Sequence, residues 1–375
     1  MTAMVNLLVE LDERFDARAS AAALQQIDAA GFACSPDASA DGRTLAWIDE
    51  RFGGAWSSEV AAGRAVVAMR DGAPLGFAGF DARGLRYAWL RGEGARDGTG
   101  IFGPFGVEPE HRGGPLGTAL LTIALARLRE RGYARALVPA VGPPGLVSYY
   151  ERTCGARVVE RFDLEALTPR PVRTVVMASG SGSNFQAVIE RVRDGLPLEL
   201  VALACNKPQA FALERARNAS IATLVLPWKR AEQTRAAYDA HLVRAVAALE
   251  PELILLLGWM HLLDRAFIEA FPNLINVHPA FLPLDGSRAE VEMPDGSVIP
   301  AFRGAHAIAD ALAAKSPWTG VSVHGVTLEA DRGPILVRKP LRVEAGDDEA
   351  SLLARLHGLE HQLVIAGVRR WLFER

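Results

Sequence analysis

Residues 174–184 read TVVMASGSGSN, and this stretch decides the fold of the second half of the chain. Its first five residues are apolar or β-branched, which is typical of a buried strand. A glycine-rich run follows at once, and helical apolar spacing then extends from Asn184 to Arg193. A strand, a glycine-rich turn and a helix in this order predict the start of an α/β domain.

The same alternation continues along the rest of the chain. Short apolar strands are expected at 198–204, 222–226, 253–257 and 274–277, with amphipathic helices between them, including 235–249 and 265–270. Continuous apolar strands separated by helices indicate a mostly parallel sheet with helices on both faces.

The first half of the chain has a different pattern. Two strand-like runs, 64–70 and 74–81, flank Asp71-Gly72, which is a hairpin signal. We also expect strands at 101–107, 137–140 and 156–164, and a long amphipathic helix at 116–131. This combination predicts an α+β domain with antiparallel pairing. Two prolines between 167 and 173 suggest a short linker, so we predict domains at 1–166 and 173–375 with a linker at 167–172.

Composition limits the possible functions. The chain has 375 residues, 50% of them hydrophobic, and a formal net charge of −3, with a pI near 6.3. This charge argues against nucleic-acid binding through bulk electrostatics. The three cysteines are scattered and suit a reducing cytoplasm without structural zinc. The longest apolar run, 253–260, is too short to cross a membrane. We therefore expect a cytoplasmic protein whose partners are small molecules, with no metal ion.

Asn276 and His278 are the first candidate catalytic residues. They lie two positions apart at the end of an expected strand, and Pro279 follows. Alternate strand residues point to the same face, so the amide and the imidazole should share one pocket. A fixed N–H donor beside a titratable ring suits the stabilisation of an oxyanion. The alternative is a pair of satisfied polar groups that cap a strand.

The glycine-rich turn is a candidate anion site. Gly180 and Gly182 allow close backbone approach, and the start of the following helix offers free N–H groups. Ser181, Ser183 and Asn184 add side-chain donors and an N-cap. The pattern predicts a phosphate cradle, and the alternative is a glycine-rich turn without a ligand.

Asp331 lies on a tight turn between two expected strands, in the run Ala330-Asp331-Arg332-Gly333-Pro334. An acid on a turn is usually solvated or caps the backbone. It takes part in catalysis only if the fold brings it to His278.

Together these motifs resemble the phosphoribosylglycinamide formyltransferases, a family with a Rossmann-like fold. The resemblance extends from about Arg173 to the end of the chain and includes Cys205-Asn206-Lys207, Leu213 to Ala216, Gly258 to Leu263, and Glu360-His361. It implies transfer of the formyl group of 10-formyltetrahydrofolate to the amine of glycinamide ribonucleotide, a step of purine biosynthesis. Asn276 and protonated His278 would stabilise the oxyanion. Asp331 would favour the charged form of His278 and help to move protons.

The resemblance also implies binding residues. Gly180 to Asn184 would hold the phosphate of the substrate, and Glu360 would contact its ribose. Met260, His261, Leu262 and Leu263 would line the pterin pocket, largely through backbone groups. The alternative is formylation of another phosphorylated amine or an amino sugar.

Residues 284–303 form a longer connection than this family leads us to expect. Pro294-Asp295-Gly296 inside it predicts a small β-hairpin. This insertion could cover the pocket or contact the other domain, and a surface insertion without a role is an equal alternative.

Residues 103–121 of the first half form a strand, a basic glycine-rich turn and a helix, and resemble the acetyl-coenzyme A loop of the GNAT acetyltransferases. The resemblance implies that Val107 offers backbone groups to the coenzyme arm and that Tyr150 protonates the leaving thiolate. The pyrophosphate would be surrounded by Arg112, Gly113, Gly114, Leu116, Gly117 and Thr118.

Pro115 departs from this pattern, which has glycine there. Proline lacks an N–H group, so one possible phosphate donor is lost. Three interpretations of the first domain stay open: an active acetyltransferase, a coenzyme-binding regulator of the formyltransferase, and a degenerate structural module.

Overall fold

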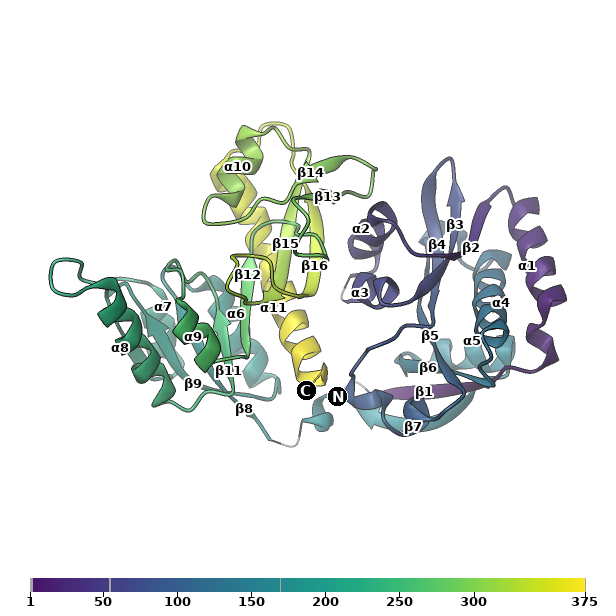
Figure 1. The fold of residues 1–375 in the computed structure, drawn as a ribbon, viewed down its shortest axis with the longest axis horizontal. Coiled ribbons are helices and arrows are strands. Elements are labelled where there is room, and N and C mark those ends of the chain that lie inside the picture. The colour runs from purple at the N-terminus through teal and green to yellow at the C-terminus, as the bar shows by residue number, and fades with distance from the viewer. Residues whose placement is uncertain (1–2, 54, 169, 375) are drawn as a thin grey trace. The chain divides into compact units, whose positions relative to one another are not determined.

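The computed structural model describes residues 3–53, 55–168 and 170–374. Contacts within the chain divide it into two compact units (Figure 1). The first comprises Met1–Leu167 together with Met293–Ser297 and Leu372–Arg375, and the second comprises Thr168–Glu292 and Val298–Trp371. Pro169, in the expected linker, lies outside the described residues.

The first unit is built on a seven-stranded sheet in the order β2-β3-β4-β5-β6-β1-β7. Neighbouring strands pair antiparallel, except β5 and β6, which are parallel. The strands are β1 (Ala3–Glu10), β2 (Ala33–Ala38), β3 (Arg64–Arg70), β4 (Ala73–Phe80), β5 (Thr99–Val107), β6 (Arg135–Val141) and β7 (Arg157–Asp163). The α-helices are α1 (Ala17–Ala29), α2 (Gly42–Arg51), α3 (Trp56–Ala61), α4 (Pro115–Glu130) and α5 (Pro144–Cys154). Short 3₁₀ turns lie at Glu13–Phe15, Ala88–Leu90, Gly92–Ala95, Pro109–His111 and Glu165–Leu167.

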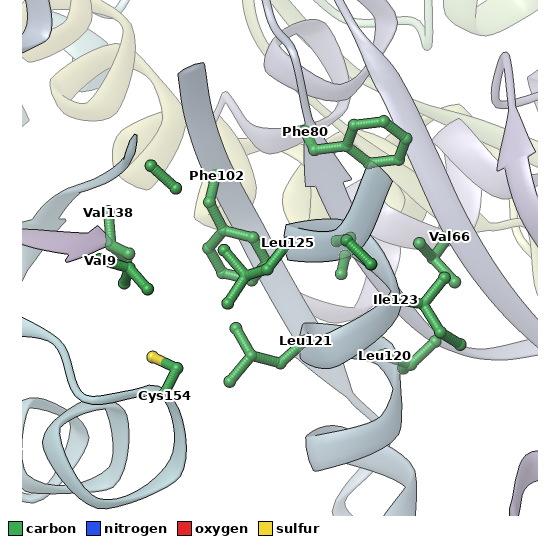
Figure 2. Packing of buried hydrophobic residues seen from close by; sticks show 14 of the residues in the cluster. Val9, Val66, Phe80, Phe102, Leu120, Leu121, Ile123, Leu125, Val138 and Cys154 are labelled. Carbon is green, nitrogen blue, oxygen red and sulfur yellow. The ribbon is translucent and has the colours of Figure 1, made fainter. Parts of the chain in front are cut away.

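Helices cover both faces of this sheet, and β3 shows why. Val66 and Ala68 of β3 belong to the core cluster beneath α1 and α4, part of which is drawn in Figure 2. Ala65 and Val67 belong to a second cluster with Trp47 of α2. Successive strand residues point to opposite faces, so a continuous apolar strand is buried on both sides.

The strands β5 and β6 separate along their length. Their parallel pairs run from Thr99↔Arg135 to Ile101↔Leu137, whereas β5 continues to pair with β4 as far as Val107↔Gly76. The second half of β5 therefore leaves β6 just before the chain enters the glycine-rich turn and α4.

The second unit has a seven-stranded sheet in the order β10-β9-β8-β11-β12-β15-β16. The pairs from β10 to β12 are parallel, and β15 and β16 are antiparallel additions. The strands are β8 (Val172–Ala178), β9 (Leu198–Cys205), β10 (Thr223–Val225), β11 (Leu253–Leu256), β12 (Leu274–His278), β15 (Trp318–Gly325) and β16 (Ile335–Arg342), with a separate hairpin of β13 (Glu290–Glu292) and β14 (Val298–Pro300). The helices are α6 (Ser183–Arg193), α7 (Ala212–Asn218), α8 (Arg235–Ala247), α9 (Arg265–Ala270), α10 (Ala307–Ala313) and α11 (Glu349–Glu374).

One core cluster of this unit joins β8 and β11 to α8 and α9 through residues such as Val175, Leu242 and Phe267. The long helix α11 approaches β15 closely, since a Cβ on Gly367 would lie 2.5 Å from Val323 Cγ1.

These observations confirm the expected fold class: an antiparallel α+β unit followed by a mostly parallel α/β unit. The hairpin at Asp71-Gly72 and the small hairpin inside the insertion are both present as β3–β4 and β13–β14. The sequence patterns missed two strands of the first unit: β1, which lies between β6 and β7, and β2, which pairs with β3. They also placed the start of β8 late, because Val172 lies in that strand rather than in a linker.

Across the residues that the structure describes, no helix has the length and apolar character needed to cross a membrane.

Candidate functional site

Asn276 lies opposite a histidine that the sequence patterns did not assign to the site. In the antiparallel pairing of β12 with β15, Asn276 faces His324, and Asn276 Nδ2 is 3.2 Å from His324 Nε2. His324 Nδ1 is 2.7 Å from the Gly325 carbonyl oxygen, which can only accept, so Nδ1 carries the hydrogen. His324 Nε2 then accepts from Asn276, whose second N–H remains for a ligand.

His278 lies two residues further along β12 and is 4% exposed. Its Nε2 is 2.7 Å from the carbonyl oxygen of Phe302, and its Nδ1 is 3.6 Å from Asp331 Oδ2. Both ring nitrogens therefore face acceptors, one of them charged. The protonated ring would be complemented on both sides.

Asp331 comes to this pair from the turn between β15 and β16. Its Oδ1 is 3.5 Å from His324 Nε2, and its Oδ2 accepts a 2.7 Å hydrogen bond from the Gly304 N–H group. The backbone of Asp331 is left-handed, with φ of 55°. A Cβ on Gly333 would lie 1.8 Å from the Gly325 carbonyl oxygen, so only glycine fits there. This turn geometry fixes the position from which Asp331 reaches the two histidines.

The electrostatics of the cluster follow from burial and charge. Burial alone raises the pKa of Asp331, but the adjacent His324 ring, the nearby His278 and the Gly304 N–H group outweigh it and lower the pKa to about 2. Burial has the largest effect on His278 and lowers its pKa, although Asp331 and the Phe302 carbonyl act in the opposite direction. Without a ligand, the pair at pH 7 is a carboxylate beside a neutral imidazole.

The glycine-rich turn after β8 leaves the start of α6 open. Gly182 is the N-cap, with φ of 69°, and no described side chain caps the helix there. The expected side-chain N-cap from Ser181, Ser183 or Asn184 is therefore wrong. The first N–H groups of α6 keep no side-chain partner at the cap, which is the arrangement that attracts an anion. A Cβ on Gly182 would lie 2.8 Å from Ala212 Cβ, because α7 packs directly against the turn.

Two residues expected to bind substrate contact each other, Asn184 on α6 and Glu360 on α11. Asn184 Nδ2 donates a 2.8 Å hydrogen bond to Glu360 Oε2, and both residues are buried. Asn184 thus holds the Glu360 carboxylate and is not an N-cap.

Arg215 of α7 was not assigned a role from the sequence, although it belongs to a quoted family motif. Its Nε donates to the Ser181 carbonyl at 2.9 Å and its Nη1 to Gln186 Oε1 at 3.2 Å. A guanidinium therefore lies against the glycine-rich turn and adds positive charge where an anion is expected.

The four residues expected to line a pterin pocket have different environments. Met260 and Leu262 are 57% and 75% exposed. The ring of His261 lies among Trp228, Tyr238 and Trp259, and burial lowers its pKa. Leu263 packs against the core cluster of β8, β11, α8 and α9.

A cavity of about 560 Å³ lies beside the Asp331 turn. Its lining consists of Ile268, Glu269, Gly286, Ser287, Val326, Thr327, Leu328, Glu329 and Arg332. As far as the chain is described, Met260 to Leu263 are not part of this lining. Sequence reasoning missed these residues because they come from α9, the insertion and the β15–β16 turn, which are far apart in the sequence.

The first unit also has a glycine-rich turn, between β5 and α4. Pro115 is the first residue of α4, Gly114 is its N-cap without a side-chain cap in the described chain, and Gly113 has φ of 78°. Arg112 Nε donates to the Val107 carbonyl at 2.9 Å, so one N–H of this guanidinium is already bonded to the carbonyl expected to contact the coenzyme arm. Gly117 is partly buried and Thr118 is exposed at the start of α4.

Several residues expected at this coenzyme site are buried in the core. Leu116 is 3% exposed and Tyr150 is 6% exposed, with its ring against Phe102. Burial raises the pKa of Tyr150. The neighbouring Tyr149 stacks on Phe105, and its hydroxyl lies 3.6 Å from where a Cβ on Gly117 would be. Tyr149 is therefore the tyrosine that lies next to the glycine-rich turn.

Within the described residues, no group of three or more His, Cys, Asp or Glu side chains is arranged to hold a metal ion.

Comparison with protein families assigns both halves of the chain. The formyl transferase family matches residues 172–289 and 295–368, which together make up just over half of the chain. The acetyltransferase (GNAT) family matches residues 28–156. The stretch between the two formyl transferase matches is the tip of the insertion that carries β13.

Named relatives match the second half. Phosphoribosylglycinamide formyltransferase of Escherichia coli (strain K12) is 36% identical over 191 residues, 50% of this chain and 82% of that protein. The trifunctional purine biosynthetic protein adenosine-3 of Drosophila melanogaster is 35% identical over 214 residues, 54% of this chain but 14% of that protein. Among solved structures, glycinamide ribonucleotide transformylase 1 from Symbiobacterium toebii is 31% identical, with 54% of this chain and 88% of that chain covered and a TM-score of 0.48.

Proposed function

This chain belongs to the formyl transferase family, and from that premise we propose that it transfers the formyl group of 10-formyltetrahydrofolate to the amine of glycinamide ribonucleotide. The observation that carries the proposal is the buried cluster of Asn276, His278, His324 and Asp331. The E. coli relative that bears this activity in its name matches over most of its length.

The open start of α6 supports a phosphorylated substrate. Its free N–H groups and the Arg215 guanidinium would hold the phosphate of the ribonucleotide. Glu360, kept in place by Asn184, would accept hydrogen bonds from ribose hydroxyls. The cavity beside Asp331 would receive the pterin, since its lining combines the apolar Ile268 and Val326 with polar groups.

The chemistry follows from the charges at the cluster. The amine attacks the formyl carbon, a C–N bond forms, and the carbonyl electron pair moves to oxygen. The free N–H of Asn276 donates to this oxyanion. The developing negative charge raises the pKa of His278, which takes up the proton released by the amine, and the Asp331 carboxylate stabilises the imidazolium. The intermediate collapses as the bond to N10 breaks and N10 receives this proton.

Assay of the purified full chain with glycinamide ribonucleotide and 10-formyltetrahydrofolate tests the proposal. Formylation by the wild-type chain and its loss in His278→Ala would support it. A folded wild-type chain that formylates a phosphorylated amino sugar instead would redirect the substrate assignment, and a folded chain without formylation would refute it.

For the first unit we propose binding of acetyl-coenzyme A in the gap where β5 leaves β6. The separation of these strands and the glycine-rich turn at the start of α4 favour this ligand, together with the GNAT match. Transfer of its acetyl group to an amine would make the chain bifunctional, and binding without transfer would indicate a regulatory module. Titration calorimetry of the full chain with acetyl-coenzyme A, followed by an assay for free thiol, separates these cases. Absence of binding would leave a structural module.

A further inference from the structure

The two ends of the insertion meet the catalytic residues directly. We call residues 286–288 and 302–304 the clasp, because these two segments lie where the chain enters and leaves the insertion. The Phe302 carbonyl accepts from His278 Nε2 at 2.7 Å, and the Gly304 N–H donates to Asp331 Oδ2 at 2.7 Å. Two residues of the clasp thus contact the acid–imidazole pair, Phe302 at His278 and Gly304 at Asp331.

Arg303 lies between these two contacts and ties the clasp together. Its Nε donates to the Asp331 carbonyl at 3.2 Å. Its Nη2 donates to the carbonyls of Gly286 at 3.3 Å and Arg288 at 2.8 Å, on the other side of the clasp. One planar guanidinium therefore joins the start of the insertion, its end and the Asp331 turn.

Arg332, on the Asp331 turn, makes a second set of hydrogen bonds to the start of the insertion. Arg332 Nη1 donates to the carbonyls of Gly286 at 2.6 Å and Ser287 at 3.2 Å. Gly286 lies so close to the turn that a Cβ there would be 2.1 Å from the Arg332 carbonyl oxygen. Two arginines and the close approach at Gly286 thus hold the clasp on the Asp331 turn.

We propose that Arg303 is a positioning residue for formyl transfer, which keeps the Phe302 carbonyl on His278 Nε2 so that Nδ1, facing Asp331, is the nitrogen that gains and loses a proton. The proposal rests on the proposed function for its catalytic consequence. A carbonyl oxygen cannot donate, so the neutral His278 ring keeps its hydrogen on Nε2 as long as the clasp stays in place. The proton taken up during transfer then binds Nδ1, beside the carboxylate that stabilises it.

This assignment gives the C-terminal end of the insertion a function. A surface loop without a role would make no contact with the catalytic pair, whereas Phe302 in the insertion supplies an acceptor to His278 and the adjoining Gly304 supplies a donor to Asp331. The tip of the insertion, β13 and β14, is not needed for these contacts.

The test uses the full-length chain with Arg303→Ala, Arg303→Lys and, as a matched control, Arg288→Ala. The Arg288 side chain is exposed and only its carbonyl belongs to the clasp, so the control removes one positive charge and leaves the clasp intact. We expect Arg303→Ala to lower kcat about 10²-fold while the KM for glycinamide ribonucleotide changes by less than about threefold, because the reacting groups are displaced and the open start of α6 is not. The kcat of Arg303→Lys should also fall, since an ammonium group cannot span the three carbonyls.

A nitrogen NMR spectrum of histidine-labelled protein gives a readout independent of activity. The signal of His278, identified by its loss in His278→Gln, should show hydrogen on Nε2 in the wild type and a tautomer mixture in Arg303→Ala. Hydrogen on Nδ1 in the wild type, an unchanged spectrum in Arg303→Ala, or full activity of Arg303→Lys would overturn the proposal.

Gly286→Ala provides a second route if Arg303→Ala does not fold. It pushes the clasp off the Asp331 turn while Arg303 remains, and it should change the His278 spectrum in the same direction. If the wild-type chain proves unable to formylate glycinamide ribonucleotide, the proposed function fails. The tautomer measurement still decides whether the clasp controls His278.

Discussion

Two turns in this chain have a similar local structure, but the side chains around them differ. Each follows a strand, contains glycines and leads into a helix whose N-cap is a glycine: Gly182 before α6 and Gly114 before α4. At α6 the guanidinium of Arg215 lies on the turn, and a buried acid–imidazole cluster lies on the same sheet. At α4 the first helical N–H is absent, and Arg112 is bound to the Val107 carbonyl.

The difference shows that a glycine-rich turn does not define an activity. The turn offers an anion site in both units, but the groups that can act on a ligand come from elsewhere. In the second unit they arrive from β12, β15, the Asp331 turn and the insertion. Near α4 the expected Leu116 and Tyr150 are instead part of the apolar core.

Among the substitutions that test this difference between the two turns, we expect the largest effect at Asp331. Asp331→Asn should lower the kcat of formyl transfer about 10³-fold, since the neutral amide can no longer stabilise the imidazolium, while KM stays near the wild-type value. Steady-state kinetics with the full chain measure both constants. Asp310→Asn, an exposed acid on α10, is the control. Unchanged turnover would show that the cluster has only a structural role, and the two turns would then no longer differ in the catalytic groups around them.

A smaller effect is expected at the turn before α6. Gly182→Ala places a Cβ against Ala212 in a backbone region that disfavours L side chains, which costs about 1–2 kcal/mol. The KM for the phosphorylated substrate should rise about tenfold with little change in kcat. Gly358→Ala is the control, since no atom lies within 4 Å of the added methyl group. A fall in kcat alone would mean that this turn does not hold the phosphate.

At the turn before α4 the expected change is a gain. Pro115→Ala restores the N–H group at the first position of the helix and should tighten acetyl-coenzyme A binding about threefold, as one added hydrogen bond does. Calorimetry measures the dissociation constant. Pro144→Ala makes the same substitution at the first position of α5 and serves as the control. An equal response of both variants would remove the turn from coenzyme binding.

The smallest expected effect is a change in the pKa of His278, which tests how Asp331 acts on this ring. Burial lowers the pKa of His278 and Asp331 partly counteracts it, so Asp331→Asn should lower the pKa further. Because the folded value lies below that of the unfolded chain, His278 contributes stability above the unfolded pKa, and this is lost as pH falls through the folded pKa. Proton NMR of the His278 ring across the acid range measures the shift. A rise of the pKa in the variant would contradict the assigned role of Asp331.

Much of this organisation could be predicted from local patterns. Alternating apolar runs and helices give the α/β unit, and Asp71-Gly72 and Asp295-Gly296 give two hairpins. Asn276 and His278 were recognised because strand periodicity places them on one face. The edges of elements such as β8 were less accurate, since an X-Pro pair resembles a linker until its strand partner is known.

Other parts of the site were beyond sequence reasoning. His324 is assigned by its cross-strand pairing with Asn276, forty-eight positions away. Glu360 and Asn184 meet because α11 returns to the start of α6, and their hydrogen bond joins residues 176 positions apart. The cavity beside Asp331 is lined by residues from α9, the insertion and the β15–β16 turn, so no single motif describes it.

The two fold classes, the positions of both glycine-rich turns and the Asn276–His278 pair could be predicted from local patterns, because these depend on interactions between near neighbours in the chain. The way in which His278 is held depends on packing between distant segments. Its two ring nitrogens face Phe302 and Asp331, which reach it from an insertion and a distant turn. The protonation state of a buried imidazole depends on every group within a few ångströms, and packing, not chain order, selects those groups.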